Sequence, residues 1–310
     1  MTVAGTSPDW LVPLPPSPPP LAQALEALHA TYLSYDHSIP THLCSRCFDP
    51  PMANRIIAAA RLVKQGRSPQ PEDFAQIHFE HAHCAGGEDT LKLFLPMGVE
   101  KLLYGPPPNG FGNSYPEVLE TAQQAAFWFW PTPLQDCLRD LAIALFYDWF
   151  GKGQFTLSDW RHSQPAEPDL DGPADDILDL CLLTLISPAD MVQSLSQMHT
   201  PWADNALAHP IANSLTAPFY CSPDTSAENT LYQDASAQIA ETLTAVFRQA
   251  QLAYVTPDWL QNAFFRNISS HPELAAQLSD YENYYDVKTV KLRGSPKGEI
   301  LLDWPDLAQV

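Results

Sequence analysis

The chain has no long apolar run and few basic residues, and both absences exclude functions. No segment offers the roughly 20 uninterrupted apolar residues that a membrane-spanning helix needs, and the N-terminal stretch lacks the positive start and apolar centre of a signal peptide. Only 16 Lys and Arg stand against 36 Asp and Glu, a net charge of -20, and no long basic run occurs. We therefore expect a cytoplasmic protein that binds neither a membrane nor nucleic acid.

Several motifs of common enzymes are also missing from the sequence. There is no Gly-x-Gly-x-x-Gly and no Walker lysine, so no nucleotide site is indicated. The zinc-protease pattern His-Glu-x-x-His and its inverse are absent, and there is no serine nucleophile elbow. The sequence therefore points to no particular reaction or substrate.

What the chain does have is proline and helical periodicity. Its 31 prolines divide 310 residues into segments that repeat one pattern, namely a Pro- or Asp-marked start, a stretch with helical spacing of apolar residues, and a breaker. This pattern predicts an all-α protein of roughly ten helices, either a multi-helix bundle or a solenoid-like stack of helical hairpins. Only residues 287–304 alternate as strands do, which predicts a short C-terminal β-hairpin.

The positions of the prolines also suggest how the chain is organised. Residues 1–20 are Pro-rich and are expected to be extended along the protein. A helical region at 21–164 and a second one at 173–310, separated by a loop rich in Pro and Asp, are expected to pack as one unit. Aromatic residues at 127–130 and 146–150 are expected to form a packed centre. Pro96 should kink or divide the helix that contains it.

Cysteine and histidine gather in two places and predict a metal site. Cys44 and Cys47 form a Cys-x-x-Cys pair, whose spacing lets two thiolates reach one ion from a tight turn. His81 and Cys84 are three residues apart, so they would share one face of a helix. We expect these four residues to hold a structural zinc ion, with His83 as the first substitute for His81. In a cytoplasmic protein the six cysteines should be reduced.

Other interpretations of this cluster stay open at the level of sequence. The cysteines could be buried free thiols or a redox pair. His42 and His78 are further candidate ligands. If only three residues bind the metal, an open site near His78, His81 and His83 with Glu80 as base would make the protein a metal-dependent hydrolase.

The segment around the cluster resembles a group of bacterial proteins that has no established activity. In that group a Cys-x-x-Cys segment leads to a helix with a Gly, an Asp, a Phe-Leu-Pro motif and a Glu at matching spacing. The likeness spans about residues 42–104, with a weaker likeness at 273–285, and Met97 stands where the group has Arg. The resemblance implies a helical fold and a genuine Cys-x-x-Cys unit. The matching residues are Cys44, Cys47, Asp73, Phe74, Gly87, Asp89, Phe94, Leu95, Pro96 and Glu100.

The acidic surface suggests how such a protein would act. A strongly negative protein attracts partners of opposite charge. We therefore expect a non-enzymatic protein that binds a basic protein partner, in the manner of an inhibitor or an immunity factor.

Overall fold

The structure is a computed structural model, and it describes residues 10–70, 73–74, 77, 84–100, 122, 127–155, 170, 173–213, 239, 243, 246–247, 250–251 and 253–280. Within these residues the chain is helical, and one isolated bridge between Val12 and Ile186 is the only β pairing. The prediction of an all-α protein is confirmed. The hairpin predicted at 287–304 lies outside the described residues.

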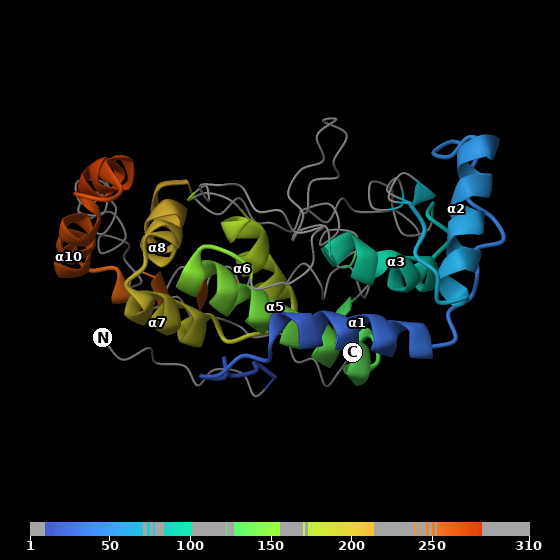
Figure 1. Ribbon diagram of the computed structural model, residues 1–310, viewed down its shortest axis with the longest axis horizontal. Coiled ribbons are helices and arrows are strands. Elements are labelled where there is room, and N and C mark those ends of the chain that lie inside the picture. The colour runs from blue at the N-terminus through green and yellow to red at the C-terminus, as the bar shows by residue number, and fades with distance from the viewer. Residues whose placement is uncertain are drawn as a thin grey trace, which may run out of the picture.

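Figure 1 shows the helices spread along an elongated molecule, with α10 at one end and α2 at the other. No helix in the described part of the chain is long and apolar enough to cross a bilayer. A further helical stretch covers 272–280. The elements are α1 (Leu21–Ser34), α2 (Pro50–Lys64), α3 (Glu88–Glu100), the 3-10 helix η4 (Phe127–Phe129), α5 (Thr132–Lys152), α6 (Ala174–Leu183), α7 (Pro188–Met198), α8 (Pro201–Asn213) and α10 (Pro257–Asn267).

Three helices begin with the same local signal, a capping side chain followed by proline. The carboxylate of Asp49 accepts a hydrogen bond from the N–H of Met52 at 2.8 Å and so caps α2. Ser187 caps α7 and Thr256 caps α10 in the same manner. A capping side chain satisfies one of the free N–H groups of the first turn, and proline is tolerated there because its missing N–H would have no helical partner. The predicted Pro-marked helix starts are therefore real at these positions.

The core is built around α5, which lies between α1 and the helices α6, α7 and α8. One helix in contact with four others is a bundle arrangement, whereas repeats of a solenoid contact only their neighbours. The hydroxyl of Tyr32 on α1 donates to the carbonyl of Leu134 at the start of α5 at 3.3 Å. The predicted aromatic centre is present, since Phe127, Phe146 and Phe150 are all fully buried.

Helix α3 continues without a break through Pro96. Of the two predicted effects of this proline, a kink or a division of the helix, the division does not occur. A proline inside a helix removes one backbone donor and crowds the preceding turn. Here Pro96 and its neighbours Leu95 and Val99 are buried, and Phe94 stacks on Phe74 with ring centroids 5.2 Å apart. Packing of this face against the core maintains the helix across the missing hydrogen bond.

The Pro-rich segment at 10–20 is bound to α5 and to the connection between α6 and α7. The N–H of Val12 donates to the carbonyl of Leu185 at 2.9 Å, and the N–H of Ser187 donates back to the carbonyl of Val12 at 2.8 Å. The hydroxyl of Tyr147 on α5 donates to the carbonyl of Pro15 at 2.8 Å. These bonds hold an extended segment, which cannot form a helix of its own, along α5 and the connection between α6 and α7.

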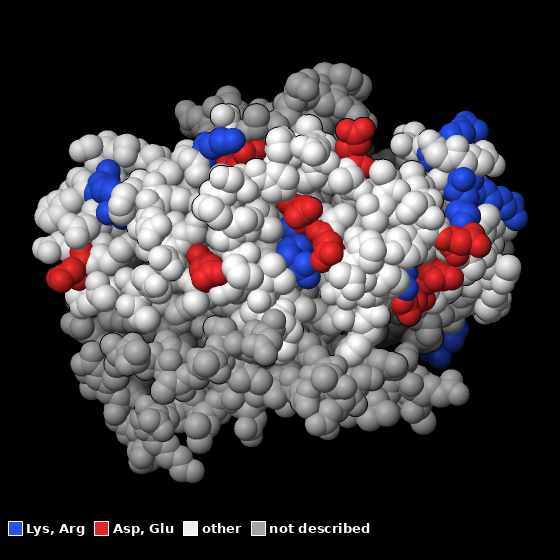
Figure 2. All heavy atoms as spheres, turned by 90° about the horizontal axis from the view of Figure 1, so that it is seen from below, with Lys and Arg blue, Asp and Glu red and all other residues white. Residues whose placement is uncertain are grey.

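Charged side chains on the described surface are partly paired. Arg139 and Asp136 are 2.6 Å apart, and Lys64 and Asp36 are 3.0 Å apart. On the face shown in Figure 2, acidic side chains lie in several separate places, some of them beside Lys or Arg. Exposed ion pairs of this kind contribute little to stability, typically about 0–1 kcal/mol. On this face the negative charge is not gathered into a single patch.

Candidate metal centre

Three cysteines from two distant segments meet at the start of α2 and α3. The sulfur atoms of Cys44, Cys47 and Cys84 all lie within 4.8 Å of one another. Cys84 is buried, with 7% of its surface exposed, and Cys44 and Cys47 are half-buried. None of the three is in a disulfide. The Cys-x-x-Cys pair and Cys84 therefore form one cluster of thiols.

A tight turn brings the first two sulfurs together. The N–H groups of Cys47 and Phe48 both donate to the carbonyl of Cys44, at 3.1 Å and 2.9 Å. Leu43 and Phe48, which flank the turn, are buried in the core. The turn is thus anchored on both sides, and Cys44 and Cys47, which pack against the same core, stay half-buried.

The third sulfur is brought in by a backbone contact between the segments. The N–H of Cys44 donates to the carbonyl of Cys84 at 3.0 Å. Two residues later Gly86 has φ +92°, and a Cβ atom on it would lie 2.8 Å from the Cβ of Pro40 and 2.9 Å from the hydroxyl of Thr90. Only glycine fits both that backbone conformation and that close approach. Gly86 therefore allows the turn before α3 to reach the loop that carries Cys44.

A second polar tie lies beside the cluster. The carboxylate of Asp89, in the first turn of α3, accepts hydrogen bonds from the hydroxyl and the N–H of Ser38, at 2.7 Å and 3.2 Å. Burial acts to raise the pKa of Asp89, but these bonds and the nearby Lys92 outweigh it and hold the pKa below its ordinary value. The tie is charged at neutral pH and fastens the start of α3 to the segment before the cysteine turn.

The thiol of Cys44 differs in electrostatic surroundings from the buried thiols of Cys137 and Cys181. The N–H groups of Arg46 and Cys47 donate to the sulfur of Cys44 and lower its pKa, while partial burial acts the other way. Burial instead raises the pKa of Cys137 to about 11 and raises that of Cys181 further. Metals bind the thiolate form, so the cluster is the place in the described chain where thiol chemistry favours a metal.

Of the five predicted ligands, the structure brings Cys44, Cys47 and Cys84 together. The other two, His81 and His83, lie outside the described residues. Among the residues that the structure does describe, no histidine or carboxylate joins the three sulfurs as a fourth ligand. His42 belongs to the described part and is exposed, so the structure gives it no place in the cluster.

Features that matter around this centre were missed by reasoning from sequence. The pair of Ser38 and Asp89 had no recognisable signal, because the two residues are far apart in the chain and both types are common at helix starts. The glycine pair Gly86 and Gly87 received no role in the site from the sequence. A glycine pair directly after a candidate ligand is a signal for a close approach of two segments, and it could have been used.

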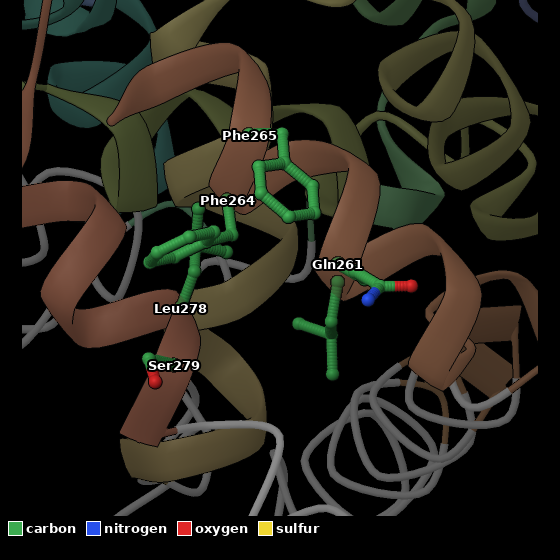
Figure 3. A pocket seen from close by; sticks show the side chains of 6 residues that line it. Gln261, Phe264, Phe265, Leu278 and Ser279 are labelled. Carbon is green, nitrogen blue, oxygen red and sulfur yellow. The ribbon is translucent and has the colours of Figure 1, made fainter. Parts of the chain in front are cut away.

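A hollow at the opposite end of the molecule is a different kind of site (Figure 3). It has a volume of about 160 Å³ and lies between α10 and the helical stretch 272–280. Its lining is apolar apart from one amide and one hydroxyl, and it contains no acidic or basic side chain. It offers no general acid or base, so the hollow does not support a hydrolytic site. The lining residues are Leu260, Gln261, Phe264, Phe265, Leu278 and Ser279.

Comparisons of the chain with protein-family models, with curated proteins and with solved structures find no match in any of the three. The resemblance to the bacterial group with the Cys-x-x-Cys segment is therefore not supported by them and stays a prediction. What the protein does has to be argued from the geometry of the cysteine cluster.

Proposed function

We propose that the chain binds one zinc ion through Cys44, Cys47 and Cys84, and that the ion holds the cysteine turn against the segment before α3. The observation that carries the proposal is the approach of the three sulfur atoms to within 4.8 Å of one another. Zinc bound tetrahedrally by sulfur at about 2.3 Å places the sulfurs about 3.8 Å apart. The upper limit of 4.8 Å between the sulfurs in the protein is compatible with that geometry.

The fourth ligand in this proposal is His81, with His83 as its substitute. His81 lies three residues before Cys84 and His83 lies directly before it. Either would complete a set of three cysteines and one histidine. That set is one of those found in structural zinc sites, whereas catalytic zinc is usually held by three ligands richer in histidine and keeps a position for water.

The ligand set therefore favours a structural role over hydrolysis. Four protein ligands leave no open position at which the metal could activate water. The hydrolase alternative depends on His78 and Glu80, which lie outside the described residues, and it stays an untested alternative.

The proposed ion would stabilise the junction between the segments that lead into α2 and α3. Helix α2 packs on α3, and the backbone bond from Cys44 to Cys84 and the hydrogen bonds between Ser38 and Asp89 join the segments that lead into them. A structural zinc ion contributes its binding free energy to folding, because the ligands are not gathered in the unfolded chain. Removing it should loosen the end of the molecule that holds α2 and α3 (Figure 1).

Elemental mass spectrometry on the full chain, purified without a histidine tag, tests the proposal. We expect one zinc ion per chain in the wild type, and none in the variants Cys44→Ser and Cys84→Ser. Cys137→Ser is the matched control, because Cys137 is buried away from the cluster and its thiol donates to the carbonyl of Leu134 at 3.3 Å, a bond that a serine hydroxyl can also make. Wild-type protein without zinc, or unchanged zinc in Cys84→Ser, would contradict the proposal.

We also propose that the zinc-bound protein acts by binding a basic protein partner, in an inhibitor-like or immunity-like role. The support is the net charge of -20. On the face in Figure 2 the acidic residues are dispersed, so the proposal rests on the net charge of the whole chain. The test is whether a basic protein captured by the immobilised chain is released as salt rises from about 0.05 to 0.5 M, as screening requires. Capture that is independent of salt would contradict a charge-driven interaction.

A further inference from the structure

We infer that Cys44 and Cys84 form a site of reversible oxidation, at which a peroxide joins the two sulfurs in a disulfide and releases the zinc ion. This inference rests on the proposed zinc site and concerns its regulation. It follows from three features of the described residues, namely the closeness of the sulfurs, the access to one of them, and the backbone contact between the two positions.

Access distinguishes the cluster from the other described thiols. Cys44 is half-buried, so a molecule as small as hydrogen peroxide can reach its sulfur. Cys137 and Cys181 are enclosed in the core, and their thiols already donate to the carbonyls of Leu134 and Ala142. Oxidation of a thiol depends on its exposure, and Cys44 is more exposed than the buried Cys137 and Cys181.

The backbone contact selects Cys84 as the second sulfur. The hydrogen bond of 3.0 Å from the N–H of Cys44 to the carbonyl of Cys84 holds the two residues side by side. A disulfide needs Cα atoms about 4.4–6.8 Å apart, a spacing that two residues joined by a backbone hydrogen bond can meet. The sulfurs are already within 4.8 Å. The bond can therefore form without separating the two segments.

The chemistry balances with a peroxide as the oxidant. The thiolate of Cys44 attacks one oxygen of hydrogen peroxide, the O–O bond breaks, and Cys44 becomes a sulfenic acid as hydroxide leaves. The thiolate of Cys84 then attacks the sulfur of Cys44, an S–S bond forms, and a second hydroxide leaves. Two thiolates have lost two electrons, and the peroxide has gained them as two hydroxide ions.

Oxidation replaces the link through the zinc ion with a covalent link between the same two segments. A disulfide sulfur is a poor zinc ligand, so the ion loses two of its ligands and dissociates. The new bond joins the same two segments that the ion had joined, and it closes a loop of about 40 residues, which restricts the unfolded chain. The oxidised protein should therefore stay folded while it gives up its metal.

The experiment treats zinc-loaded full-length protein with hydrogen peroxide and follows zinc release with a chromogenic chelator. We expect loss of the whole zinc content, unchanged helical circular dichroism, a peptide that links Cys44 to Cys84 in non-reducing mass spectrometry, and uptake of zinc again after dithiothreitol. Cys137→Ser should behave as the wild type does. Retention of zinc under conditions that fully oxidise glutathione would overturn the inference, and so would a link from Cys44 to Cys47.

One further variant separates this inference from the proposed zinc site. Cys47→Ser lacks a ligand but keeps both sulfurs of the proposed disulfide, so peroxide should still join Cys44 to Cys84 in it. If the wild type carries no zinc and Cys47→Ser forms the disulfide, the metal proposal fails while the oxidation site stands. If the wild type carries zinc and neither protein forms the disulfide, the zinc site stands and the oxidation site is wrong.

Discussion

Replacement of Gly86 by alanine tests the contact that brings Cys84 to the cysteine turn. At φ +92° an alanine is strained, and strain of this type costs about 1–3 kcal/mol. The new Cβ would also stand 2.8 Å from the Cβ of Pro40, so the two segments must move apart. Forced displacement in a packed region adds about 1–3 kcal/mol. We expect Gly86→Ala to destabilise the protein by roughly 2–6 kcal/mol in total.

The neighbouring residue supplies a control for backbone strain. Gly87 has φ +91°, nearly the same as Gly86, but a Cβ atom there would have no neighbour within 4 Å. Gly87→Ala should therefore cost only the strain, about 1–3 kcal/mol. The difference between the two variants measures the close approach of the turn to the loop at Pro40.

The assay combines urea unfolding with zinc affinity measured by competition with a chelator of known affinity. Gly86→Ala should lose more stability than Gly87→Ala and should also bind zinc more weakly, because Cys84 moves away from Cys44. Gly87→Ala should keep its zinc affinity. Equal effects of the two substitutions on stability and on zinc binding would refute the account of how the two segments meet.

Two further substitutions have expected outcomes. Asp49→Ala removes the carboxylate that accepts a hydrogen bond from the N–H of Met52 and caps α2. It should lower the free energy of unfolding, measured by urea titration, by about 1 kcal/mol. An unchanged free energy of unfolding would contradict the role of Asp49 as a cap. Burial, together with the charge of Asp175, raises the pKa of Asp176 to about 7. Between about pH 4 and pH 7 the folded protein therefore keeps a proton on Asp176 that the unfolded chain has lost. The free energy of unfolding consequently falls as the pH rises through this range. Asp176→Asn should therefore unfold at a higher temperature than the wild type at pH 8 but not at pH 4, and equal midpoints at pH 8 would contradict this.

Local features of the fold could be predicted from the sequence because their causes are local. The starts of α2, α7 and α10 are specified by a capping residue followed by proline within a few positions. The continuity of α3 through Pro96 depends instead on burial against other helices, which no local pattern reports. The bridge from Val12 to Ile186 likewise joins residues that lie far apart in the sequence and have no special chemistry.

The candidate site was predictable to the extent that its chemistry is unusual. Cysteines are few in this chain, so the Cys-x-x-Cys pair and a later cysteine among histidines predicted one shared metal site, although about 40 residues separate them. The glycine pair at 86 and 87 hinted at a close approach of two segments, but the sequence could not indicate that Gly86 meets Pro40, nor that Ser38 and Asp89 join the start of α3 to the segment before the cysteine turn. Such ties become visible only when both segments are placed in space.

X-ray absorption at the zinc edge of the purified full-length protein would test the central claim most directly. A zinc ion held by Cys44, Cys47, Cys84 and one histidine should show three sulfur neighbours at about 2.3 Å and one nitrogen at about 2.0–2.1 Å. A first shell of nitrogen and oxygen alone, or protein that takes up no zinc, would contradict the account.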